Sequence, residues 1–107
     1  MKRRILWLAA VLALMAGVAS AELRYTKLVA SSAGADTRTI GAGTLLVVND
    51  GASTIHVRVF WTGETPADAT QSSPEIKSGE SFTFSKTEVL AISIISESSS
   101  TVRLFYW

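Results

Sequence analysis

Residues 44–61 read TLLVVNDGASTIHVRVFW, and this stretch decides the fold class. A short run of β-forming residues, 45–48, is followed by the turn-forming tripeptide Asn49-Asp50-Gly51 and then by a strict alternation. Because successive side chains of a strand point to opposite sides, the alternation predicts a strand with one buried face. The inward set is Ile55, Val57, Val59 and Trp61, and the outward set is His56, Arg58 and Phe60. The tripeptide predicts a tight reversal between the two strands.

The same pattern of apolar alternation and turn residues recurs through the rest of the chain. In residues 23–30, for example, Leu23, Tyr25 and Val29 share a face that Lys27 interrupts. Strand candidates fall at 23–30, 37–40, 44–48, 54–61, 75–77, 81–85, 89–96 and 101–107, and the longest polar loop is 62–73. About seven strands without helical periodicity predict an all-β domain, a small β-sandwich that is immunoglobulin-like or jelly-roll-like. The pattern leaves the strand order open.

Residues 1–21 have the three parts of a secretory signal peptide. Lys2, Arg3 and Arg4 are followed by an apolar run at 5–18 and by the small residues Ala19-Ser20-Ala21. The alternative is an uncleaved anchor, but a spanning helix needs about 20 apolar residues and this run is shorter. We therefore expect cleavage after Ala21, export to the periplasm or beyond the cell, and one domain over residues 22–107 without a membrane span.

Composition excludes several classes of partner and cofactor. The chain has 10 basic and 9 acidic residues, and removal of the three basic leader residues leaves a net charge of −2 without a basic cluster. Nucleic-acid binding, which depends on clustered Lys and Arg, is not expected. There is no cysteine, so neither a disulfide nor a Cys–His zinc site can form. We expect no cofactor, and stability from close packing, self-association or a bound ion.

Few residues could carry catalysis. His56 is the single histidine, and without a nucleophile motif or a second His or Cys it is interpreted as a half-exposed strand residue, neither a general base nor a metal ligand. Glu64, Asp68 and Glu75 share one loop region, which leaves a small hydrolase using paired carboxylates as the alternative function.

Aromatic residues on the outward faces give the favoured hypothesis. The alternation places five residues opposite the core set: Arg58, Phe60, Arg103, Phe105 and Trp107. Exposed rings beside arginines are typical of recognition surfaces. The alternative is that loops cover these faces or that strand twist turns the rings inward. The sequence thus predicts an exported, non-catalytic binding or assembly module whose partner is a protein, another copy of the chain, or a glycan.

Overall fold

The computed structural model describes residues 22–107, which form eight strands and no helix. The predicted signal peptide, 1–21, lies outside the described residues. Each predicted strand is found within a few residues of its expected bounds. The strands are β1 (Arg24–Ser31), β2 (Asp36–Ala42), β3 (Leu45–Asn49), β4 (Ile55–Trp61), β5 (Glu75–Ile76), β6 (Ser81–Phe84), β7 (Val89–Ser96) and β8 (Ser99–Tyr106). Within residues 22–107, no helix is long and apolar enough to cross a membrane.

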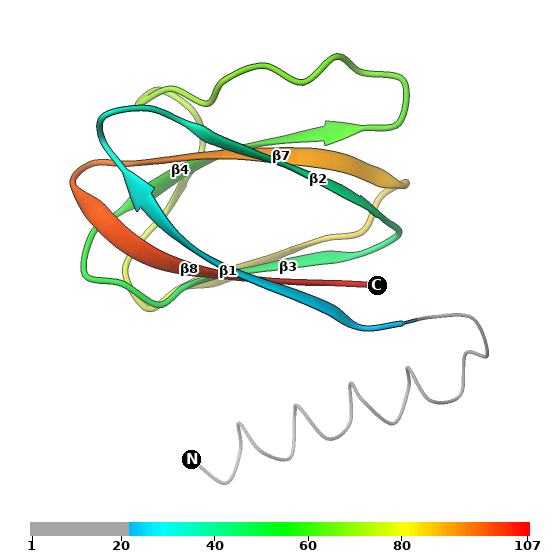
Figure 1. The fold of residues 1–107 in the computed structure, drawn as a ribbon, viewed down its shortest axis with the longest axis horizontal. Helices are drawn as coiled ribbons and strands as arrows, with labels where there is room; N and C mark the ends of the chain where they lie inside the picture. Colours follow the sequence, from blue (N-terminus) through cyan, green and yellow to red (C-terminus); the bar gives the residue numbers. More distant parts are fainter. Residues whose placement is uncertain (1–21) are drawn as a thin grey trace, which may run out of the picture.

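The strands form two antiparallel sheets of four that pack face to face, as the predicted β-sandwich class requires (Figure 1). One sheet has the order β1-β8-β3-β6, and the other has the order β2-β7-β4-β5. In the first sheet, β8 pairs with β1 from Arg24 opposite Tyr106 to Ser31 opposite Ser99, and with β3 on its other side. The first and last strands of the chain are therefore neighbours.

The core lies between the sheets and is built from the inward residues of each alternation. Ile55 and Val57 are buried, and Val59 and Trp61 pack against the core from its margin, which confirms the predicted inward face of β4. The fully buried centre comprises Leu45, Val47, Ile92, Ile94, Val102 and Leu104, among others. In β1, Leu28 and Ala30 point inward, while Tyr25 and Val29, which share the opposite face, are exposed.

The reversal predicted at Asn49-Asp50-Gly51 does not join paired strands. β3 belongs to one sheet and β4 to the other, so the turn carries the chain between the layers. The physical reason is Asn49, whose fully buried side chain bonds across the sandwich rather than into a hairpin. Gly51 packs so tightly that a Cβ there would overlap Ser100 Oγ and the backbone of Thr101, and this close approach accounts for the glycine.

The two outer faces of the sandwich differ. The chain after β4 runs along the outside of the β2-β7-β4-β5 sheet (Figure 1), where Ala69 is buried and its N–H donates to Ser93 Oγ at 2.9 Å. Phe60 is consequently buried, 3% exposed, and the prediction that it points into solvent was wrong. A bulge in the β4–β7 pairing between Phe60 and Trp61 also interrupts the alternation there.

Candidate functional site

The five residues predicted to form one binding surface do not lie on one face. Arg58 and Phe60 belong to β4, in the sheet whose outside is covered, whereas Arg103 and Phe105 belong to β8 in the other sheet. Arg58 remains exposed with its guanidinium 5.1 Å from the centre of the Phe60 ring. The alternative weighed from the sequence, that loops cover these faces, therefore holds for one sheet. The binding role of Arg103 and Phe105 stays a prediction.

Arg103 and Phe105 belong to an apolar face on the outside of the β1-β8-β3-β6 sheet. Side chains of β1, β8 and β3 form it; we call it the β1-β8-β3 face and define it by Tyr25, Lys27, Val29, Leu46, Val48, Thr101, Arg103 and Phe105. Tyr25 is 51% exposed and Val29 is 63% exposed, and both belong to β1 at the edge of the sheet. The ring of Tyr25 packs beside the ring of Phe105, with their centres 5.0 Å apart.

Two positive charges stand opposite one another within this face. Lys27 on β1 is the direct cross-strand neighbour of Arg103 on β8, and like charges in that position repel. The Nε atom of Arg103 lies 3.3 Å from Asp50 Oδ2, which offsets part of the repulsion. That Nε is nevertheless buried and makes no hydrogen bond. The face thus combines one exposed ring, two neighbouring cations and a buried donor without a hydrogen bond.

Trp107 lies at a different place again. Its N–H and C=O bond to Thr44, and its side chain lines an open depression of about 500 Å³ between the ends of the sheets. Arg24 and Glu88 also line this depression. Trp107 therefore does not extend the ring pair of Tyr25 and Phe105.

The three loop carboxylates have separate surroundings. Glu64 accepts a hydrogen bond from the N–H of Trp61 at 2.7 Å and closes the turn after β4. Asp68 is exposed in the loop that covers the sheet. Glu75 is opposite His56 in the β4–β5 pairing. Paired-carboxylate catalysis needs two acids held at a fixed separation in a cleft, and no observation of the described residues favours it.

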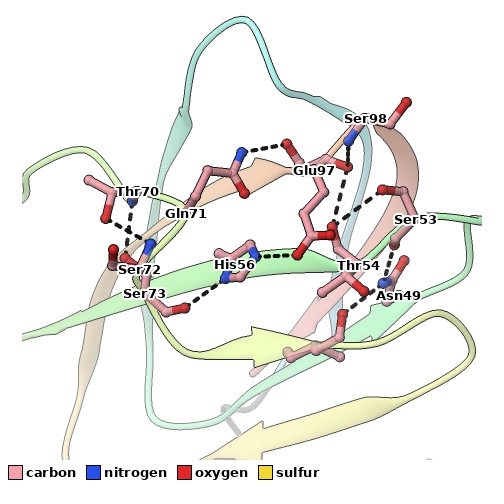
Figure 2. A network of polar contacts seen from close by, with 12 residues as sticks. Asn49, Ser53, Thr54, His56, Thr70, Gln71, Ser72, Ser73, Glu97 and Ser98 are labelled. Carbon is pink, nitrogen blue, oxygen red and sulfur yellow. Dashed lines mark hydrogen bonds and ion pairs between the residues drawn. The ribbon is translucent and has the colours of Figure 1, made fainter.

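His56 is the centre of a polar network that the sequence did not predict (Figure 2). The side chain is buried, not half-exposed, because the segment before β5 lies over it. Its Nδ1 lies 2.7 Å from the carbonyl oxygen of Ser73, and its Nε2 lies 2.9 Å from Oε2 of Glu97 in the turn between β7 and β8. A ring nitrogen of His56 and a carboxylate oxygen of each of Glu75 and Glu97 all lie within 4.8 Å of one another.

Opposing effects act on the pKa of His56. Burial is the largest single effect and lowers the pKa, because it disfavours the charged ring. The hydrogen bond to Ser73, the hydrogen bond and charge of Glu97, and the charge of Glu75 all raise it. Together they exceed the effect of burial, so the pKa of His56 lies above its ordinary value.

Sequence reasoning missed Tyr25, Lys27 and Glu97 as members of these two sites. On β1 the inward positions are Thr26, Leu28 and Ala30, and the apolar pair Leu28 and Ala30 was the available sign of this face. No local signal could identify Glu97, because its contact with His56 spans 41 residues.

Comparison with known proteins places the chain in no established family. No family model and no curated protein matches it. Among solved structures, it is similar to a de novo designed double-stranded β-helix, with a TM-score of 0.43 and 20% identity over 76% of this chain and 95% of that one. It is also similar to a chain from Bacillus endospore appendages, described as disulfide-linked pili, with a TM-score of 0.43 and 15% identity over 79% and 84%. Neither likeness bears on function, and no family is assigned.

Proposed function

We propose that this chain is an exported, non-catalytic binding or assembly module of jelly-roll-like architecture. The strand order β1-β8-β3-β6 against β2-β7-β4-β5 supports the jelly roll, a double sheet of eight strands, over the immunoglobulin-like alternative with its ABED and CFG sheets. The three-part leader in residues 1–21 supports export to the periplasm or outside the cell.

The docking surface of the module is the β1-β8-β3 face. The observation that carries this proposal is the contrast between the two outer faces: the chain covers one with its own loop and leaves Tyr25 and Val29 exposed on the other. Exposed rings on paired strands present contact area with little loss of side-chain freedom on binding. A sheet face of this kind is a typical protein-docking surface.

The partner that fits is a protein surface with a carboxylate among apolar residues. Lys27 and Arg103 repel one another across β1 and β8, and an incoming carboxylate beside the exposed Lys27 would relieve this repulsion. A second copy in face-to-face symmetric contact would bring the same cations together, so charge complementarity disfavours a symmetric dimer through this face.

The test uses two matched display libraries of apolar peptides, one carrying Asp and Glu at the variable polar positions and one carrying Lys and Arg. Chain 22–107 should enrich the acidic library. Lys27→Glu should reverse this preference, and Tyr25→Ser should weaken binding of the selected peptides about ten-fold, as the loss of an aromatic anchor does. Lys86→Glu, an exposed charge reversal in the turn after β6, should leave binding unchanged.

Four outcomes would contradict the proposal. One is equal enrichment of both libraries, and another is equal effects of Lys27→Glu and Lys86→Glu. The third is a dimer in light scattering that Tyr25→Ser dissociates, which would make a second copy the occupant. Retention on a glycan array that depends on Tyr25 and Phe105 would replace the protein partner with a sugar. Circular dichroism of each variant shows whether the sheets remain intact.

A further inference from the structure

The contacts of His56 determine how many protons its ring must carry. A backbone carbonyl can only accept, so Nδ1 donates its N–H to Ser73 O. Glu97 is exposed and its carboxylate accepts in turn from Nε2 at 2.9 Å. Both bonds form together only when the ring has two N–H groups, which is the imidazolium form. A neutral ring keeps one bond and turns a lone pair toward the other oxygen.

The charged groups around His56 favour that form. Glu97 approaches from the turn between β7 and β8, and Glu75 approaches from β5 as the cross-strand partner of His56. Arg58, on the same side of β4, is the cation of this region, and its guanidinium is over the Phe60 ring. The β7 neighbour Ile95 and residues 70–73 of the covering loop have no ionisable side chain. Two negative charges thus face the ring.

The two bonds of His56 connect the end of the covering loop to the turn between β7 and β8. Ser73 lies near the end of the loop over the β2-β7-β4-β5 sheet, and Glu97 begins the turn into β8. Beyond His56, the side-chain amide of Gln71 also links these segments, donating to Ser96 O at 2.9 Å. The loop end itself is anchored to β4 by the bond from Val57 N–H to the carbonyl of Pro74.

We propose that His56 is a proton-operated latch, whose bonds to Ser73 in the loop over the β2-β7-β4-β5 sheet and to Glu97 in the β7–β8 turn exist together only while its ring is doubly protonated. The latch lies on the opposite sheet from the β1-β8-β3 face, so it is independent of the proposed docking function. Because the pKa of His56 is raised in the folded protein, the latch contributes its full stability at pH values below the unfolded pKa of about 6.5. This stability is lost as the pH rises through the higher pKa of the folded state.

Titration of chain 22–107 by NMR, in EDTA, tests the latch. The His56 ring resonances should titrate above about 6.5. Protection factors of the Ser73 amide, which donates to Thr70 O in the folded loop, should fall through the same pH range. The equilibrium constant for local opening at Ser73 should rise about ten-fold for each pH unit between the unfolded and the folded pKa of His56. Protection of the Leu104 amide in the centre of β8 should remain constant, because global unfolding is not required.

Glu97→Gln is the diagnostic variant, since Glu97 is exposed and its loss leaves the core intact. It should lower the pKa of His56 and weaken the pH response of the Ser73 amide, whereas Glu88→Gln, an exposed control before β7, should change neither. A His56 pKa at or below the ordinary value, or Ser73 protection that is constant with pH, would overturn the proposal. A response that occurs only without EDTA would assign the cluster to a metal ion and overturn it as well.

Discussion

Asn49 shows at the scale of a single residue how a polar group can hold two sheets together. Its side chain is fully buried and uses both ends. The amide donates to Ser53 O at 2.8 Å and to Ile76 O at 2.9 Å, and Oδ1 accepts from Ser100 Oγ at 2.6 Å and from Gly51 N at 3.3 Å. Buried polar groups that are fully paired stabilise one arrangement of the chain, because every alternative leaves them without partners.

Asn49→Ala should therefore lower the free energy of unfolding by about 3 kcal/mol, since it leaves several buried donors and acceptors unpaired. Urea unfolding measures the change. Ser100→Ala, which removes one of the partners, should cost about 1 kcal/mol. Thr83→Ala, exposed on β6, should change stability by less than about 0.5 kcal/mol. Equal midpoints for Asn49→Ala and Thr83→Ala would show that the network contributes little.

At the scale of elements, the covering loop separates what the sequence could predict from what it could not. Alternation located the long strands, such as β4 and β8, because a strand with one buried face has a period of two. The short strands β2 and β5 were expected from the turn residues that follow them. The exposure of Phe60 could not be predicted, because it depends on where a loop of polar residues folds back. The His56–Glu97 contact and the strand order depend likewise on pairings between distant segments, which leave no local pattern.

Ala69 and Ala67 offer a direct test of how the loop is held. Ala69 is 3% exposed and lies against the sheet, whereas Ala67, two residues earlier, is exposed. Ala69→Gln should detach the loop, because the longer side chain does not fit beneath it, and overpacking of this kind costs about 1–3 kcal/mol. Hydrogen exchange should become faster at residues 69–73 but not in β8. Ala67→Gln should leave exchange unchanged, and equal effects would exclude this docking of the loop.

At the scale of the whole molecule, the domain has no disulfide to support its fold, since the chain contains no cysteine. A small domain buries a modest fraction of its surface. Here the two sheets enclose one continuous apolar core that draws on seven of the eight strands. The remaining strand, β6, adds Phe84 to its margin. Close packing, one of the sources expected from the sequence, is therefore present in the described residues.

The predicted leader concerns the whole chain and can be tested by mass. Cleavage after Ala21 should give an exported protein that begins at Glu22, because Ala19-Ser20-Ala21 has the small residues that signal peptidase requires. Intact-mass measurement of protein recovered from the periplasm or medium determines the N-terminus. Ala21→Leu, which places a large side chain at the cleavage position, should slow processing. A mature protein that still carries residues 1–21 would show an anchored form instead.

The position of β8 between β1 and β3 has a consequence for the rate at which the chain folds. Arg24 is paired with Tyr106, so the first sheet closes only by bringing together residues about as far apart in sequence as the domain allows. The entropy of closing such large loops is lost before the pairing stabilises them, and β proteins dominated by distant pairs fold in milliseconds to seconds. β1 and β3 remain without their shared neighbour until β8 has been synthesised. The first sheet therefore cannot assemble progressively from its N-terminal strands, and its closure is a single late event.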